Sequence, residues 1–189
     1  MTAPAISDMG ALAAARVLAT NQVTEQFFAS RADDIARTCQ AMAARFQIGG
    51  RLLVAGDDAQ RSDVAHVVVE FLHPVVVGKR ALPAIALPDV HSGAAVKAFS
   101  VLGGDNDIVM VLSAQALSPA CRALVSAAQA RGMYSIVMSG SDRAPTNANQ
   151  RFVVESTDAC MVQETHEVLY HVLWELVHVF LDHRAGGPS

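Results

Sequence analysis

The chain has 189 residues, of which 52% are hydrophobic and 17% charged, and its formal net charge is -4. This length fits one domain with a sizeable core, and the apolar surplus indicates that some hydrophobic surface is buried between subunits. The small negative charge, without a cluster of lysine or arginine, argues against direct binding of nucleic acid. No apolar run reaches the roughly 18 residues that span a membrane, because charged residues and histidine interrupt each one.

The cysteines and the N-terminal sequence favour a cytoplasmic protein. Cys39, Cys121 and Cys160 are widely spaced and odd in number, and they form no CxxC motif. We therefore expect reduced, mostly buried thiols. The N-terminal sequence lacks a basic segment followed by an apolar block, so it does not have the pattern of a signal peptide.

Hydrophobic patterns predict helices and short buried strands in alternation. Residues 22–47 have apolar residues at helical spacing, a shorter helix is expected before them, and Gly49 and Gly50 end this region. Strands are predicted at 51–55, 84–87, 107–112, 134–138 and 151–154, and further helices at 61–72, 93–100, 118–131 and 160–183. Continuous apolar strands that alternate with helices are typical of a parallel sheet covered on both faces.

These elements predict an α/β protein with one domain over residues 1–189. The expected architecture is a three-layer α/β/α sandwich with a five-stranded parallel sheet, N-terminal helices and a long C-terminal helix. Within it, residues 1–48 are expected to supply oligomerisation helices, and residues 51–183 the α/β core and the terminal helix.

Two pairs of polar side chains lie in strongly apolar helical stretches. His66 and Glu70 are four residues apart and share one helix face. Gln163 and His171 are eight residues apart, about 2.2 turns, so they lie roughly 80° apart around the axis. Because polar side chains in apolar stretches need partners, the four could converge on a small metal site or an acid/base pair. An ordinary surface or core contact is the alternative for the first pair.

Other polar residues receive structural interpretations. Ser118 and Pro119 have the pattern of a helix N-cap followed by a first-turn proline, although the Ser118 hydroxyl could also bind an anion. Four further histidines have no partner visible in the sequence and are expected to be ordinary surface or core residues: His73, His91, His178 and His183.

The order of these motifs resembles the SIS (sugar isomerase) family, and within it the sedoheptulose-7-phosphate isomerase, or phosphoheptose isomerase, group. The resemblance covers residues 20–183 through the segments GGRLLVAG, HVVVE, PAIAL-x-D, DIVMVLS and Q-x7-H. It implies a flavodoxin-like SIS fold and a zinc site in the active centre, formed by His66, Glu70, Gln163 and His171. It also implies that Glu70 acts as base and His171 as acid in an aldose–ketose isomerisation.

The sequence departs from the family pattern where a sugar phosphate would bind. Family members carry a CGNGGS loop after the first strand, whereas this chain has AGDDAQ. Their STSGNS loop holds the phosphate through hydroxyls and backbone N–H groups, whereas this chain has SAQALS. Larger apolar side chains crowd a phosphate, and the two aspartates repel it. The resemblance therefore implies only a weak phosphate or sugar site, at Ser113, Gln115 and Ser118.

Three functions follow from this mixture of retained and altered motifs. The first is a diverged SIS-domain protein that keeps a metal or acid/base site but binds sugar phosphates weakly. The second is an active isomerase of sedoheptulose 7-phosphate or a related phosphosugar, against which the altered loops count. The third is a non-catalytic protein-interaction module, like the SIS-fold protein that associates with the bacterial replication initiator. The retained Glu70 and His171 count against this third function.

The resemblance also implies an assembly. Family members are usually homotetramers in which long terminal helices form a central bundle. The apolar surplus and the predicted helix at 160–183 suit such a bundle, so we expect a tetramer, with a dimer as the alternative. A phosphosugar ligand and a protein partner both remain open, and neither a nucleic acid nor a membrane is expected.

Overall fold

The structure is a computed structural model that describes residues 6–74, 76–141, 144 and 146–185. Its strands are β1 (Leu52–Gly56), β2 (Ala84–Ala86), β3 (Ile108–Leu112), β4 (Tyr134–Ser139) and β5 (Gln150–Val153). Its helices are α1 (Ile6–Gln47), α2 (Arg61–Leu72), α3 (Ala94–Leu102), α4 (Pro119–Ala130) and α5 (Ala159–Ala185), with one turn of 3-10 helix at Asp58–Gln60. The strands form one sheet in the order β2-β1-β3-β4-β5, and every neighbouring pair is parallel.

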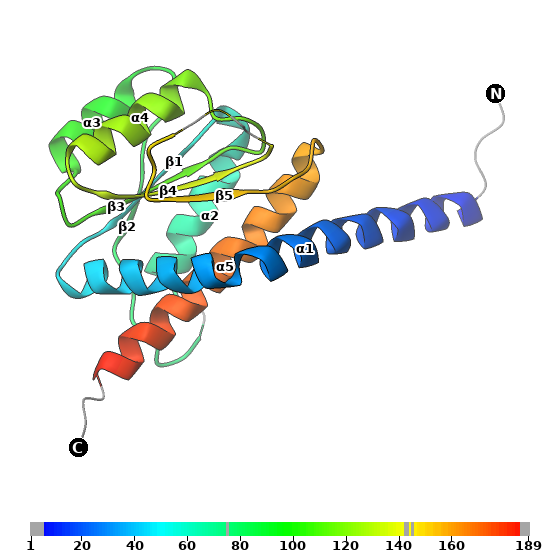
Figure 1. Ribbon diagram of the computed structural model, residues 1–189, viewed down its shortest axis with the longest axis horizontal. Helices are drawn as coiled ribbons and strands as arrows, with labels where there is room; N and C mark the ends of the chain where they lie inside the picture. The colour runs from blue at the N-terminus through cyan, green and yellow to red at the C-terminus, as the bar shows by residue number, and fades with distance from the viewer. Residues whose placement is uncertain (1–5, 75, 142–143, 145, 186–189) are drawn as a thin grey trace.

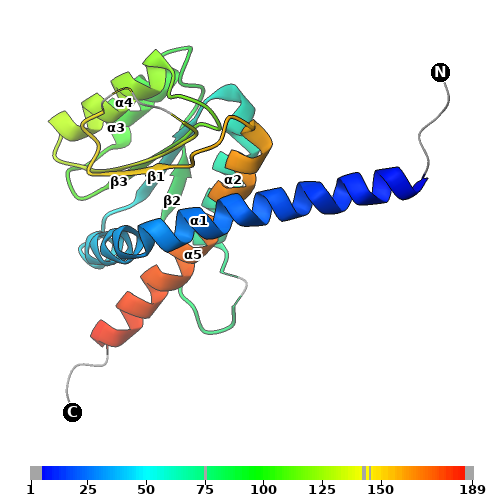
Figure 2. The same cartoon turned by 45° about the vertical axis from the view of Figure 1, so that its right-hand side comes forward.

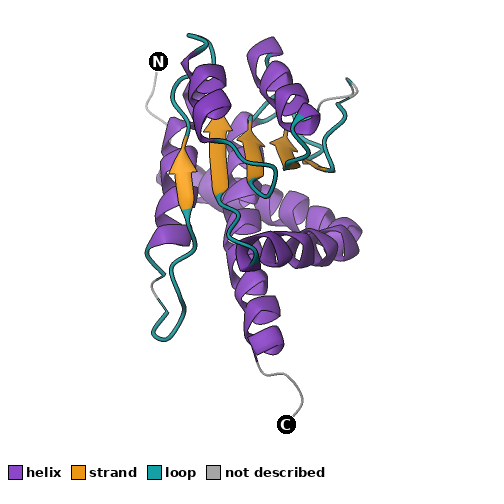
Figure 3. Ribbon diagram, turned by 90° about the vertical axis from the view of Figure 1, so that its left-hand side faces the viewer, coloured by secondary structure: helices purple, strands orange, loops and turns teal. Residues whose placement is uncertain are grey.

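The sheet lies between two layers of helices, which confirms the predicted three-layer sandwich (Figure 1). Helices α1, α2 and α5 cover one face, and α3 and α4 cover the other (Figure 3). Successive side chains of a strand point to opposite faces, so each strand contributes to two cores. In β1, Leu52 and Val54 pack with α1, α2 and α5, whereas Leu53 and Ala55 pack with α3 and α4.

The N-terminal region is a single 42-residue helix, so the prediction of two helices in this region was wrong. The reason is that no glycine or proline occurs between Ala11 and Gln47 to interrupt it, and Gly10 is accommodated inside the helix. The second half of α1 packs against α5, and Arg16 and Thr20 in the first half still contact the start of α5. The N-terminal end of α1 projects away from the sandwich (Figure 2). Among the described residues, no helix combines the length and apolar character needed to cross a membrane.

The strand order reverses between β1 and β3, and this reversal places a crevice at their carboxyl ends. Helix α2 follows β1 on one face, whereas α4 follows β3 on the other, so the two connecting loops diverge. The strands end side by side at Gly56 and Leu112. A Cβ at Gly56 would lie 3.0 Å from the Leu112 carbonyl oxygen, so glycine permits this close approach. Ligands of open α/β sheets bind in such crevices.

Candidate functional site

Three of the four predicted site residues meet between α2 and α5. On α2, His66 Nε2 lies 3.3 Å from Glu70 Oε1, one helical turn away. From α5, His171 Nε2 lies 3.4 Å from His66 Nε2 and 3.8 Å from Glu70 Oε1. One donor atom from each residue lies within 4.8 Å of the other two. Two imidazole nitrogens and a carboxylate oxygen therefore face one point, and this group is called the His-Glu-His cluster below.

Gln163, the fourth predicted residue, lies on α5 two turns before His171 and contacts a different group. Its Nε2 donates a 3.0 Å hydrogen bond to Asp63 Oδ1 on α2. Burial raises the pKa of Asp63, and the hydrogen bond from Gln163 opposes part of this rise. Asp63 Oδ2 is buried and has no hydrogen-bond partner among the described residues. The role of Gln163 as a metal ligand stays a prediction.

Tyr170 is a neighbour of the cluster that sequence reasoning missed. Its hydroxyl lies 2.9 Å from His66 Nδ1, and the Glu167 Oε1 atom lies 3.6 Å from the same nitrogen. Burial raises the pKa of the Tyr170 hydroxyl well above its usual value, so the phenol stays protonated. The sequence feature that could have identified Tyr170 is its position seven residues after Gln163, which places both residues on one face of α5.

The three residues predicted for phosphate or sugar binding line a pocket of about 430 Å³ at the carboxyl ends of β1 and β3. Ser113, Gln115 and Ser118 come from the loop after β3. The loop after β1, the loop after β2 and the start of α5 supply the other polar lining residues, namely Asp57, Gln60, His91, Cys160 and Gln163. This cavity, which lies where the strand order reverses, is called the switch-point pocket below. Of the four residues predicted for the metal site, Gln163 belongs to its lining, and Gln163 lies on the same helix as His171.

The serine hydroxyls of the loop after β3 are engaged inside the protein. Ser113 Oγ accepts a hydrogen bond from Gln115 N and donates one to the Ala116 carbonyl oxygen, each 3.3 Å long. Ser118 Oγ accepts from Cys121 N at 3.2 Å, which confirms its predicted role as the N-cap of α4. Both hydroxyls therefore already hold the loop in shape.

A carboxylate occupies the pocket wall near the N-terminus of α4. Asp57 Oδ1 lies 3.4 Å from His91 Nε2 and accepts a hydrogen bond from Cys121 Sγ, also at 3.4 Å. Burial, together with the nearby charge of Asp57, raises the pKa of Cys121 to about 12, so the thiol stays a donor. From the sequence, His91 was expected to be an ordinary surface or core residue. Its position after β2 could have indicated a site residue, because the carboxyl end of β2 lies beside that of β1.

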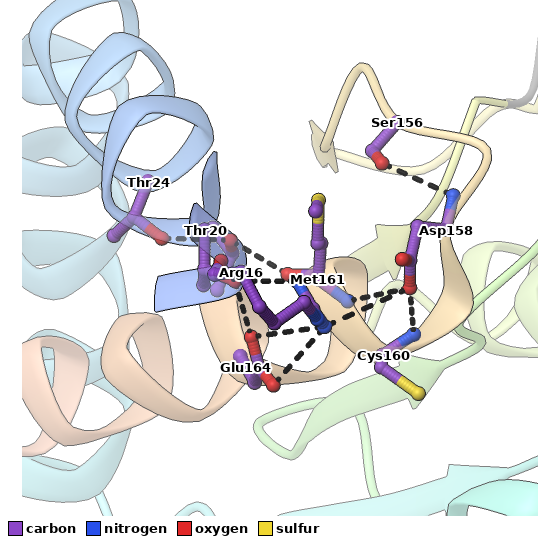
Figure 4. A network of polar contacts seen from close by, with 9 residues as sticks. Arg16, Thr20, Thr24, Ser156, Asp158, Cys160, Met161 and Glu164 are labelled. Atoms are coloured by element: carbon purple, nitrogen blue, oxygen red, sulfur yellow. Dashed lines mark hydrogen bonds and ion pairs between the residues drawn. The ribbon is translucent and has the colours of Figure 1, made fainter. Parts of the chain in front are cut away.

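A network of polar contacts fixes the start of α5 against α1 (Figure 4). Arg16 Nη2 lies 3.3 Å from Glu164 Oε1 and 3.8 Å from Asp158 Oδ1. Thr20 Oγ1 donates to Glu164 Oε2 at 2.8 Å. Asp158 Oδ1 in turn accepts from Cys160 N at 2.9 Å, as an N-cap does. These contacts position the first turn of α5, which supplies part of the pocket wall.

Comparisons with known proteins find relatives that match most of the chain. A phosphoheptose isomerase from Thermodesulfovibrio yellowstonii is 29% identical over 174 residues, covering 85% of this chain and 87% of that protein. One from Desulfovibrio desulfuricans is 28% identical over 174 residues, covering 85% and 83%. The chain resembles the phosphoheptose isomerases. No family model matches it.

Solved phosphoheptose isomerases have the same fold. The structure from Neisseria gonorrhoeae superposes with a TM-score of 0.76 at 19% identity, covering 89% of this chain and 99% of that one. The structure from Francisella tularensis gives 0.73 at 23% identity, covering 88% and 98%. The architecture is therefore the SIS fold of phosphosugar isomerases.

The His-Glu-His cluster and the switch-point pocket are two groups of candidate site residues, and α5 contributes to both. The cluster offers a carboxylate that can accept a proton and an imidazole that can donate one. The pocket offers polar side chains that include the Asp57 carboxylate, which only accepts hydrogen bonds, and the Gln60 amide, which can donate and accept. Gln163 lines the pocket and holds α5 to α2 through its hydrogen bond to Asp63.

Proposed function

We propose that this chain is a diverged SIS-domain protein of the phosphoheptose isomerase type. In this proposal it retains an acid/base or metal site and binds sugar phosphates weakly. The observation that carries the proposal is the convergence of His66, Glu70 and His171 within 4.8 Å on two apolar helices. The relatives named phosphoheptose isomerase support the reaction class, since the resemblance extends over most of the chain.

The His-Glu-His cluster has the groups that an aldose–ketose isomerisation requires. The reaction moves a proton between C1 and C2 of a sugar through an enediol, which needs one base and one acid. Glu70 would remove the C1 proton of the ketose while His171 protonates the carbonyl oxygen at C2. Glu70 would then return its proton to C2 as His171 recovers one from the oxygen at C1, which leaves the aldose. His66 Nε2, at 3.3 Å, orients the Glu70 carboxylate.

The same three donors fit zinc. Zinc in catalytic sites accepts imidazole nitrogen and carboxylate oxygen from three protein residues and leaves a fourth position open. His66, Glu70 and His171 would hold the ion, which when bound supplies a Lewis acid for the substrate carbonyl. Gln163 could join the set after giving up its hydrogen bond to Asp63. A carboxylate engaged by a metal is a weaker base, so the two proposed roles of Glu70 compete.

Metal analysis and a sensitive isomerase assay test the proposal. Protein purified without chelator is compared with Glu70→Gln and His171→Ala, and Glu25→Gln on the exposed part of α1 serves as the control for the same chemical change. We expect bound zinc and slow turnover of sedoheptulose 7-phosphate at high enzyme concentration in the wild type and the control only. A zinc content and an isomerase rate of the wild type that are no higher than those of Glu70→Gln would reject the proposal.

We further propose that the chain assembles into a homotetramer through α1. The N-terminal half of α1 exposes large apolar side chains, since Leu12 is 62% and Leu18 is 68% exposed. Exposed apolar side chains on a projecting helix are typical of a surface that another subunit covers. Sedimentation should give a tetramer, with a dimer as the alternative, and Leu12→Lys/Leu18→Lys should dissociate it. A wild-type monomer at micromolar concentration would contradict this assembly.

A further inference from the structure

The switch-point pocket has an electrostatic character opposite to that of a phosphate site. Its lining residues, all within the described part of the chain, include the Asp57 carboxylate and no lysine or arginine. The nearest arginine of the β1 loop, Arg61, instead pairs with Asp58 at 3.4 Å. A phosphate dianion entering this pocket would meet the like charge of Asp57, and the one histidine of the lining, His91, already contacts that carboxylate. The pocket therefore disfavours the charged end of a sugar phosphate.

Some donors that could hold an anion at the start of α4 are absent or already engaged. Pro119 has no N–H group, and Cys121 N donates to the Ser118 hydroxyl. In the preceding loop, Gln115 N donates to Ser113 Oγ, whose own hydrogen is directed to a carbonyl oxygen. Anion sites at helix N-termini depend on free N–H groups, and Gln115 N and Cys121 N are already engaged within this segment.

Acceptors, in contrast, remain available. Gln60 is 2% exposed and lines the pocket, and its Oε1 atom is buried without a hydrogen-bond partner among the described residues. A buried carbonyl oxygen without a donor is costly, so native proteins normally supply one from water or a ligand. Both contacts of the Asp57 carboxylate with described residues fall on Oδ1. The pocket wall thus contains the Asp57 carboxylate and, buried within it, the unpartnered Gln60 oxygen, which a ligand hydroxyl reaches after a small rotation of the Gln60 side chain.

We propose that the switch-point pocket binds the hydroxyl-bearing end of a polyhydroxyl compound that carries no phosphate group. Asp57 and Gln60 accept hydrogen bonds from its hydroxyls, and its other end extends along α5 towards the cluster. This inference names the substrate class of the proposed isomerase-type site and rests on that proposal for the direction of the ligand. Asp57 is then a specificity-determining residue, because its charge selects hydroxyl groups over a phosphate.

Calorimetric titration with sedoheptulose, sedoheptulose 7-phosphate and inorganic phosphate tests the preference. In the wild type we expect sedoheptulose to bind about tenfold more tightly than its 7-phosphate, and inorganic phosphate not to bind. Asp57→Asn should weaken sedoheptulose binding and reduce this ratio about tenfold. The matched control is Asp58→Asn, because Asp58 is exposed, pairs with Arg61 and lies outside the pocket lining. It should leave the ratio unchanged.

Two further variants separate this inference from the proposed chemistry. Gln60→Met removes the buried acceptor at similar volume and should weaken sedoheptulose binding several-fold, with folding checked by thermal melting. His171→Ala abolishes the proposed proton transfer but should leave the binding ratio intact, so an inactive protein can still support the inference. Tighter binding of the 7-phosphate by the wild type, equal effects of Asp57→Asn and Asp58→Asn, or no sedoheptulose binding would overturn it.

Discussion

The hydroxyl of Tyr170 on α5 lies 2.9 Å from Nδ1 of His66 on α2. The two rings meet edge to face, with centroids 5.2 Å apart, and Tyr170 is fully buried. This contact fixes the orientation of the imidazole, so that its other nitrogen faces Glu70 and His171. A partner on the far nitrogen of a histidine also sets which nitrogen carries the proton. Tyr170 is therefore a positioning residue for the His-Glu-His cluster.

Replacing Tyr170 with phenylalanine tests this positioning role. Tyr170→Phe keeps the buried ring but removes the hydrogen bond to His66, so the affinity for zinc should fall about tenfold. The free energy of unfolding should fall by only about 1 kcal/mol. Chelator competition measures the first quantity and urea denaturation the second. Tyr134→Phe, on β4, is the matched control, and equal zinc affinities in the two variants would argue against the role of Tyr170.

A buried histidine should make the protein sensitive to acid. His166 is fully buried, and burial lowers its pKa to about 4, an effect that the Ser139 carbonyl only partly offsets. The unfolded chain, with a histidine pKa near 6.5, binds this proton more readily than the folded chain between pH 4 and 6.5. Stability is therefore lost as the pH falls through this window, by about 2 kcal/mol between pH 7 and 5.

The variant His166→Leu should show a flatter dependence of the free energy of unfolding on pH. Leucine has no proton to gain, so the loss between pH 7 and 5 should shrink by about 2 kcal/mol relative to the wild type. Urea denaturation at both pH values gives the difference. The exposed His183 provides the control His183→Gln, which should retain the wild-type slope. An unchanged slope in His166→Leu would show that another group controls the acid sensitivity.

The start of β1 is tied to the start of β3 by Arg51 and Asp107. Asp107 accepts hydrogen bonds from Arg51 N and Arg51 Nη2, each at 2.7 Å, and from Gly104 N at 2.8 Å. Burial alone would raise the pKa of Asp107, but these hydrogen bonds outweigh it and lower the pKa. The stabilisation is therefore present above the unfolded pKa of an aspartate and is lost as the pH falls below it.

Removing the Asp107 carboxylate should destabilise the sheet at the amino ends of β1 and β3. Asp107→Ala leaves Arg51 and two backbone N–H groups without their acceptor, which should cost about 3 kcal/mol of unfolding free energy at pH 7. Chemical denaturation measures the loss. The neighbouring exposed residue supplies the control Asp105→Ala, expected to change stability by less than about 0.5 kcal/mol. Similar values for both variants would contradict the importance of the Arg51 contact.

Local patterns were sufficient for the elements and for part of the site. Strands β1 and β3 are continuous apolar runs, and His66 and Glu70 lie one turn apart, so local patterns predict these features. The pattern of β5 is weaker, because it begins with Gln150 and Arg151. Periodicity misplaced the beginning of α1, because an exposed helix with a mixed pattern gives a weak signal. It also missed the contact between Asp57 and His91, since these residues are joined only where the ends of β1 and β2 meet.

The three cysteines should differ in reactivity, and this difference reports on the pocket. Cys39 and Cys121 are buried, and burial raises the pKa of each to about 12, so neither forms the reactive thiolate near neutral pH. Cys160 is exposed and lines the switch-point pocket. A thiol reagent should therefore label about one cysteine in the folded protein and all three after denaturation.

Labelling of Cys160 also tests whether a ligand enters the pocket. Sedoheptulose bound beside Gln60 and Asp57 would restrict access to Cys160, so saturating sedoheptulose should slow labelling several-fold while inorganic phosphate should not. Mass spectrometry of the labelled peptide identifies the cysteine, and Cys160→Ser should abolish the fast phase. Labelling of Cys121 in place of Cys160 would mean that the loop after β3 opens, because Cys121 is otherwise held beneath Ser118 and Asp57.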